Sequence, residues 1–119
     1  MFRKLGPVTG GNLVQAEQGR AESWFFANSD RAGTSEQYTF VDPKPTNTVR
    51  LLLVGESAIQ GYPQPRHLCA SAFLQLMLQD AWPDRRVEVI NLGTTAIASF
   101  PVLGITTEAL DYEPDLVVV

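Results

Sequence analysis

The stretch VRLLLVGESAIQGYP, residues 49–63, decides the fold of this 119-residue chain. Its first half is a near-continuous apolar run that ends at Gly55. Such a run is typical of a strand that is buried on both faces of a parallel sheet. Its second half begins with an acid and a serine and continues into a loop rich in Gly and Pro. Ser57 therefore lies just past the carboxyl end of a predicted strand.

The residues after this stretch alternate between helical and strand patterns. Apolar residues recur at helical spacing at Ala70, Phe73, Leu74, Met77, Leu78 and Ala81, with Ser71, Gln75 and Gln79 between them. Pro83 ends that predicted helix. The further predicted elements are a strand in RVEVINLG (86–93), a helix from Ser99 to about Tyr112, and a strand in DLVVV (115–119). The order strand, helix, strand, helix, strand predicts an α/β fold with a parallel sheet and helices on both faces.

The amino-terminal residues follow a different pattern. Residues 1–36 are polar and Gly-rich, and we expect an irregular or partly disordered lead-in with at most one short strand around Trp24–Phe26. QYTFVDPKP (37–45) predicts an edge strand, because its two prolines cannot donate to a ladder. The α/β domain is therefore expected to cover residues 37–119.

Composition and charge exclude several classes of protein. A net charge of −4 argues against non-specific binding to nucleic acid. No apolar run approaches the roughly 18 residues of a membrane helix, so no membrane segment is expected. The single cysteine, Cys69, excludes an internal disulfide. The opening MFRKLGPVTGG lacks the apolar stretch of a signal peptide, which favours a cytoplasmic default and leaves the compartment otherwise unknown.

Two loops are expected to meet at the carboxyl edge of the sheet, where ligands bind in folds of this class. Ser57 follows the first predicted strand, and Gly93 ends the second. From the residues alone, Ser57 could be a nucleophile, a phosphate-binding hydroxyl or a turn residue. GESAIQG lacks the lysine and the glycine spacing of a phosphate loop, and Glu56 would repel phosphate.

VRLLLVGESAIQGYP, RVEVINLGTTAIASF (86–100) and YEPDLVVV (112–119) together resemble the start of an SGNH hydrolase, the superfamily also called GDSL-like lipases and esterases. GES (55–57) stands where the first block of that superfamily usually reads Gly-Asp-Ser, and NLG (91–93) contains the glycine of the second block. The resemblance covers about residues 38–119, with Glu56 as a departure from the pattern. It implies a flavodoxin-like, three-layer α/β/α fold that is truncated after its third strand.

The resemblance also implies a reaction. Ser57 would be the nucleophile that attacks an ester carbonyl and forms an acyl-enzyme. The backbone N–H groups of Ser57 and Gly93 would be two donors of the oxyanion hole, and a glycine there lets its N–H approach the oxyanion closely. The substrate would be a small-molecule, glycan or lipid ester, with no metal and no cofactor.

Only the first two blocks of the superfamily are present. The superfamily keeps its base in a later Asp-x-x-His pair and supplies an asparagine just past the third strand, whereas this sequence stops at Val119. His67 matches no position of the superfamily and is interpreted as an exposed first-turn histidine. We therefore expect an amino-terminal fragment that is inactive alone, from a parent protein that could be exported or membrane-anchored. The apolar edge strand LVVV (116–119) invites association through the sheet edge.

Other interpretations of the chain and of individual residues are also open. The chain could be a non-catalytic α/β module that binds a small molecule or another protein. Tyr62 could line a substrate cleft, while Asp111, Glu113 and Asp115 are interpreted as a solvated acidic surface.

Overall fold

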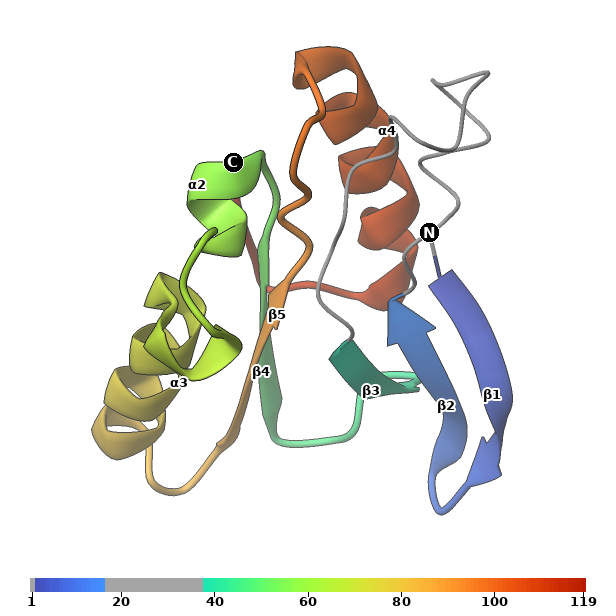
Figure 1. Ribbon diagram of the computed structural model, residues 1–119. Helices are drawn as coiled ribbons and strands as arrows, with labels where there is room; N and C mark the ends of the chain where they lie inside the picture. Colours follow the sequence, from blue (N-terminus) through green and yellow to red (C-terminus); the bar gives the residue numbers. More distant parts are fainter. Residues whose placement is uncertain (1, 17–37) are drawn as a thin grey trace.

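The structure is a computed structural model that describes residues 2–16 and 38–119. These residues form two three-stranded sheets (Figure 1). The antiparallel sheet contains β1 (Phe2–Val8), β2 (Gly11–Ala16) and β3 (Tyr38–Asp42), in that order. The parallel sheet has β4 (Thr48–Leu53) between β5 (Arg86–Asn91) and β6 (Leu116–Val118). The predicted mixed α/β class, the parallel sheet and the edge strand at QYTFVDPKP are therefore confirmed.

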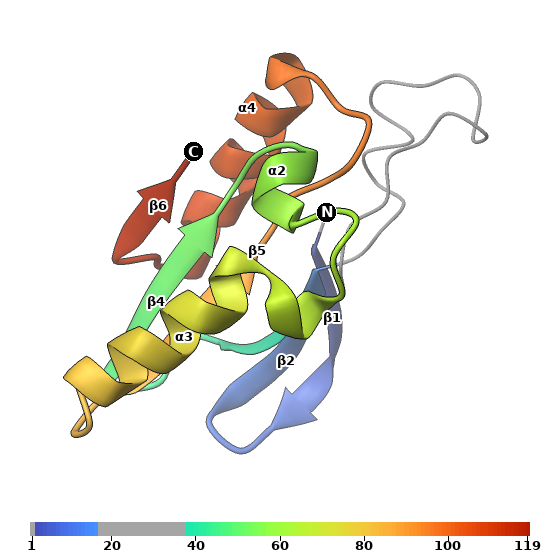
Figure 2. The same cartoon turned by 60° about the vertical axis from the view of Figure 1, so that its left-hand side comes forward.

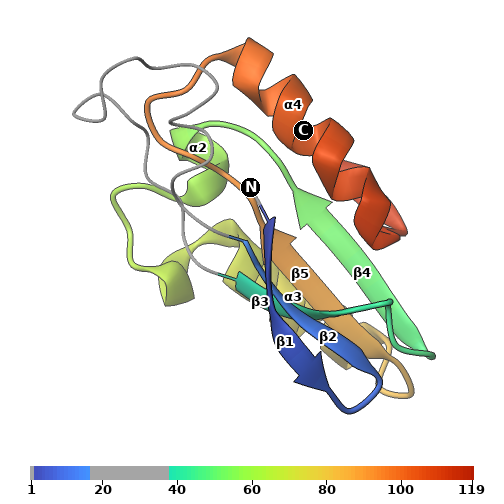
Figure 3. The same cartoon turned by 90° about the vertical axis from the view of Figure 1, so that its right-hand side faces the viewer.

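Helical segments connect the parallel strands. β4 leads into α2 (Ser57–Gln60), the 3-10 helix η2 (Arg66–Leu68) and α3 (Ala70–Ala81). β5 leads into α4 (Ser99–Ala109) and the 3-10 helix η3 (Leu110–Tyr112). α3 lies on one side of the parallel sheet, whereas α4 and the antiparallel sheet lie on the other (Figures 1 and 2). The two sheets meet where β3 lies beside β5 (Figure 3).

Side chains on the two faces of β4 and β5 form two apolar cores. The core on the α3 side contains Leu51, Leu53, Val87 and Val89, with Ile59, Leu74 and Leu78 packed against them. The core on the α4 side contains, among others, Leu52, Val54, Ile90 and Leu92, together with Phe40, Val102 and Ile105. Each fully buried side chain of this size contributes roughly 1.5–3 kcal/mol. The apolar run of β4 is thus buried on both faces, as its sequence predicts.

The predicted irregular lead-in is wrong for residues 2–16, which form the β1–β2 hairpin. The chain turns between Val8 and Gly11, where Gly10 adopts a φ of +91° that favours glycine. The hairpin depends on partners far along the chain, because β2 pairs with β3. The Phe2 ring also packs against the rings of Phe40 and Tyr112, with distances between ring centroids of 5.9 and 4.5 Å. A local pattern interrupted by Gly6 and Pro7 could not show those contacts. The short strand expected around Trp24–Phe26 lies outside the described residues.

The predicted helix 70–81 is confirmed as α3, but its glutamines turn toward the sheet. Gln75 Nε2 donates to the carbonyl oxygen of Val87 at 2.7 Å, and Gln75 Oε1 accepts the N–H of Val89 at 2.7 Å. Gln79 Oε1 accepts the N–H of Val87 at 3.0 Å. These side chains occupy the free edge of β5 as a neighbouring strand would, so this edge of the sheet is closed.

A buried arginine, Arg50, links the two sheets. Arg50 on β4 is 0% exposed and lies directly across from Glu88 on β5. Its Nε and Nη2 atoms each lie 2.9 Å from Glu88 Oε2. Its Nη1 donates to the carbonyl oxygen of Tyr112 and its Nη2 to that of Val41, both at 2.8 Å. One guanidinium therefore connects β4, β5, β3 and η3.

The acidic residues before β6 are exposed but not merely solvated. Asp115 accepts hydrogen bonds from Lys44 Nζ at 2.8 Å and from the backbone N–H of Arg50 at 2.7 Å. Glu113 accepts the backbone N–H of Lys44 at 2.9 Å. The hydrogen bond from Lys44, followed by that from Arg50, lowers the pKa of Asp115 below its ordinary value of 3.8, against the opposing effect of partial burial.

This lowered pKa predicts a pH-dependent loss of stability on acidification. A carboxylate with a lower pKa in the folded state stabilises that state above its unfolded-state pKa and ceases to do so as pH falls through the folded-state pKa. We expect Asp115→Asn to lower the free energy of unfolding at pH 7, with the difference from the wild type shrinking below about pH 3.8. Urea unfolding between pH 7 and 2 measures this difference. Asp111→Asn, at an exposed carboxylate on η3, is the control, and an equal effect of both variants would contradict the assignment.

Candidate functional site

Ser57 is the first residue of α2 and follows β4 by a tight turn. Val54 and Gly55 are buried, and Ser57 itself is half-buried. A Cβ atom on Gly55 would lie 2.6 Å from Ile59 Cγ1, so a glycine here allows α2 to fold back onto the strand end. The backbone N–H of Ser57 belongs to the first turn, where helical N–H groups have no acceptor within the helix. Ser57 therefore occupies a strand-to-helix turn.

The carboxyl ends of the three parallel strands meet at this turn. The N–H of Leu92 donates to the carbonyl of Leu53 at 2.7 Å, and the N–H of Thr94 donates to that of Gly55 at 3.0 Å. On the other side of β4, the N–H of Val54 donates to the carbonyl of Val118 at 2.8 Å. We call residues 53–57, 91–94 and 118 the exit junction. The structure thus brings together the loops that contain Ser57 and Gly93, as the sequence predicts.

Gly93 packs directly against the backbone of α2. A Cβ atom at this position would overlap the backbone nitrogen of Gln60 and would lie 2.6 Å from its Cα and 2.8 Å from the carbonyl carbon of Ile59. The N–H of Gly93 donates to Asn91 Oδ1 at 2.8 Å. The predicted oxyanion donor therefore already has an acceptor, which an oxyanion would have to replace.

Asn91, at the end of β5, is a junction residue that sequence reasoning missed. It is 1% exposed, and its Nδ2 donates to the carbonyl of Ile59 at 2.7 Å and to Ser71 Oγ at 3.1 Å. Ser71 shares a further hydrogen bond of 3.4 Å with the hydroxyl of Tyr38. One side chain thus ties together the end of α2, the start of α3 and the loop of Gly93. The sequence feature that could have indicated its role is the asparagine of NLG, a polar residue at the end of an apolar strand. The prediction from sequence considered that motif only for its glycine.

No comparison with known proteins identifies the chain. No protein-family model matches it, and neither a curated protein nor a solved structure matches it. Any functional assignment therefore rests on the residues of the exit junction themselves.

No histidine or carboxylate is hydrogen-bonded to Ser57 in the part of the chain that the structure describes, residues 2–16 and 38–119. His67 lies exposed on η2, as the sequence predicts, and lines a pocket with Arg66 and Ser71. Serine nucleophiles need a base within hydrogen-bond reach, itself oriented by a third group.

The sequence also predicts no metal site and no membrane segment, and the structure can be searched for both only in the described residues. Among them, no three His, Cys, Asp or Glu side chains are grouped so that they could hold a metal ion. No helix in the described ranges is both long and apolar enough to cross a membrane. Tyr62, proposed from sequence as a cleft residue, is 68% exposed just after α2, and its backbone N–H donates to the carbonyl of Ser57 at 3.0 Å.

Proposed function

We propose that Ser57 is the nucleophile of a serine ester hydrolase of the SGNH type, with residues 38–119 as the amino-terminal part of its catalytic domain. The observation that supports this proposal is the position of Ser57 at a strand-to-helix turn where three parallel strand ends meet. Such a turn presents a hydroxyl at the carboxyl edge of the sheet, where substrates bind in α/β folds.

The strand order supports the fold that accompanies this proposal. In the parallel sheet the first strand lies between the second and the third, because the order is β5-β4-β6. This order equals the first three strands of the flavodoxin-like order 2-1-3-4-5. We therefore propose a flavodoxin-like three-layer domain, in which α3 and α4 form the outer layers.

The proposed reaction is acyl transfer to water. Ser57 Oγ attacks the ester carbonyl carbon and gives its proton to a base, and a tetrahedral oxyanion forms. The base then returns that proton to the leaving oxygen, and the alcohol departs as the acyl-enzyme forms. Water then attacks the acyl-enzyme, releases the carboxylic acid and restores the serine. The backbone N–H of Ser57 is one oxyanion donor, and the N–H of Gly93 becomes the second once it leaves Asn91 Oδ1. The substrate class is a small-molecule, glycan or lipid ester, and the chemistry requires no metal.

A supplied base tests this proposal. Because no histidine or carboxylate is hydrogen-bonded to Ser57 within the described residues, we expect the chain to show little Ser57-dependent turnover of p-nitrophenyl acetate. With imidazole added as an external base, we expect p-nitrophenyl acetate to acetylate Ser57, as located by peptide mass spectrometry. Ser57→Ala should abolish this modification.

The control for this experiment is Ser99→Ala, which removes an exposed serine at the start of α4 and should leave the acetylation of Ser57 unchanged. Equal acetylation of Ser57 and Ser99 in the wild type would contradict a nucleophilic role of Ser57. Efficient turnover without imidazole that disappears in Ser57→Ala would instead show that the chain already contains its base.

The Gly93–Asn91 hydrogen bond favours a second candidate function, a non-catalytic α/β module that binds a small molecule or a protein. In that case the junction is a structural clamp, and Ser57 only begins α2. Failure of imidazole to promote acetylation of Ser57 in a folded chain would favour this alternative.

A further inference from the structure

A pocket separate from the exit junction opens between β3, η2 and α3. It has a volume of about 550 Å³ and lies beside the edge of β5 that Gln75 closes. Its apolar lining comes from Tyr38, Ala72, Leu76 and Val89. Small-molecule sites typically have volumes of about 300–1,000 Å³, with mostly apolar walls and a few polar groups. The size and lining of this pocket therefore suit a small organic ligand.

The neutral polar groups in the lining already have protein partners. Ser71 Oγ accepts a hydrogen bond from Asn91 and shares another with the Tyr38 hydroxyl. The side-chain amide of Gln75 bonds to the backbone of Val87 and Val89. These side chains do not need a hydrogen bond from a ligand, so the inner wall behaves as an apolar surface.

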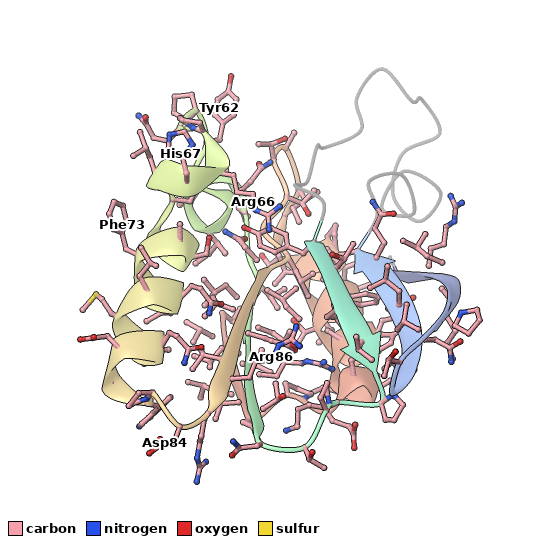
Figure 4. All side chains as sticks on the ribbon, turned by 90° about the horizontal axis from the view of Figure 1, so that it is seen from below. Tyr62, Arg66, His67, Phe73, Asp84 and Arg86 are labelled. Atoms are coloured by element: carbon pink, nitrogen blue, oxygen red, sulfur yellow. The ribbon has the colours of Figure 1, made fainter. Side chains whose placement is uncertain are left out.

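The charged side chain among the described residues of the lining is Arg66. The guanidinium carbon of Arg66 lies 3.8 Å from the centre of the Tyr38 ring, a cation–π contact that holds this cation at the pocket. His67 follows on η2, and Figure 4 shows both residues near the start of α3. No acidic residue is among the described residues of the lining. In a chain with a net charge of −4, the positive charge of Arg66 favours an anion at this pocket.

We propose that this pocket binds a small organic anion with an apolar body, its carboxylate at Arg66 and its hydrocarbon chain against Tyr38, Ala72 and Leu76. Leu76 is 69% exposed, so such a chain would remove apolar surface from water. The guanidinium fork matches the geometry of a carboxylate. This binding site is distinct from Ser57 and does not depend on the hydrolase proposal.

Titration of the ¹⁵N-labelled full chain with octanoate, octan-1-ol and acetate tests the proposal. We expect octanoate to shift the amide resonances of Tyr38 and of residues 66–76. A charge-assisted contact and a hydrocarbon chain each add affinity, so octanoate should bind at least about tenfold more tightly than octan-1-ol or acetate. Equal affinity for octanoate and octan-1-ol, or no octanoate binding up to about 10 mM, would overturn the proposal.

Matched variants locate the head group and the chain. Arg66→Gln should weaken octanoate binding about tenfold, because it removes the charge-assisted contact. Leu76→Ser should weaken binding about three- to tenfold by removing apolar contact area. Both residues are exposed, so the variants should remain folded, and their spectra will show whether they do.

Arg85→Gln removes the same charge from the exposed turn after α3, next to Asp84 at the far end of that helix in Figure 4. It should change octanoate affinity by less than about twofold, because exposed charges more than about 10 Å away are screened. A loss equal to that of Arg66→Gln, or amide shifts centred outside residues 38 and 66–76, would show that octanoate binds elsewhere.

Discussion

Arg50→Met should lower the free energy of unfolding by about 3–5 kcal/mol, the typical cost of breaking a buried ion pair. The substitution leaves Glu88 charged, with a side chain that is only 9% exposed. It also removes the donors for the carbonyl oxygens of Val41 and Tyr112. The expected loss lies toward the lower end of the range, because Arg86 Nε remains 3.1 Å from Glu88 Oε1. That is an ion contact without hydrogen-bond geometry.

The double variant Arg50→Met/Glu88→Leu separates charge burial from packing. It replaces both charges with apolar side chains, and such replacements of buried pairs are often neutral or stabilising. Two carbonyl oxygens still lose their donors, so we expect recovery of part of the loss and not all of it. Urea unfolding of the wild type, the single variant and the double variant measures these differences. A double variant at least as unstable as Arg50→Met would contradict the view that the stranded charge of Glu88 dominates the cost.

Arg50 and Glu88 show both what the sequence could predict and what it could not. VRLLLVG and RVEVINLG predicted β4 and β5 correctly, because two-sided burial leaves an almost continuous apolar run. Arg50 and Glu88 were the exceptions in those runs. They lie opposite each other in the register of the sheet, so their opposite charges satisfy one another. The apolar pattern of a strand does not show how that strand is aligned with its neighbour. The pairing of Arg50 with Glu88 could therefore not be predicted from the sequence.

The misses in the fold share one physical cause, which is dependence on distant residues. The β1–β2 hairpin needs β3 and Tyr112, and the orientation of α3 is set by hydrogen bonds from Gln75 to β5. Helical periodicity located α3 correctly, yet Phe73 and Met77, counted on its apolar face, are 52% and 69% exposed. Backbone groups at a strand edge require partners, and in α3 that requirement decided which side of the helix faces the sheet.

For the candidate site, sequence predicted positions but not partners. Ser57 and Gly93 lie on loops that meet, because the carboxyl ends of neighbouring parallel strands share one edge. The acceptor of the Gly93 N–H is the side chain of Asn91, two residues earlier, and its rotamer could not be derived from the motif. Whether Ser57 acts as a nucleophile stays a prediction for the acetylation experiment.

Gly93→Ala adds a single methyl group and should be the more disruptive of the two glycine-to-alanine substitutions at the exit junction. We expect it to lower the free energy of unfolding by about 3 kcal/mol or more. Overpacking a tight site typically costs about 1–3 kcal/mol, and here the added Cβ would meet backbone atoms. The overlap is with Gln60 and Ile59, so relief requires α2 to move as a unit. Gly93 does not have a left-handed φ, so the expected cost is steric.

Gly55→Ala is the matched control for this substitution. Its added Cβ would meet only side-chain atoms of Ile59, at 2.6 Å from Cγ1 and 3.1 Å from Cβ, and a side chain can yield where a helix backbone cannot. We expect Gly55→Ala to lose less stability than Gly93→Ala and to retain slow hydrogen exchange at the N–H of Thr94, which bonds to Gly55. Gly93→Ala should accelerate that exchange and reduce imidazole-promoted acetylation of Ser57, because Ser57 moves with α2. Wild-type stability of Gly93→Ala would mean that α2 does not pack against the exit of β5, and the junction would then not position Ser57.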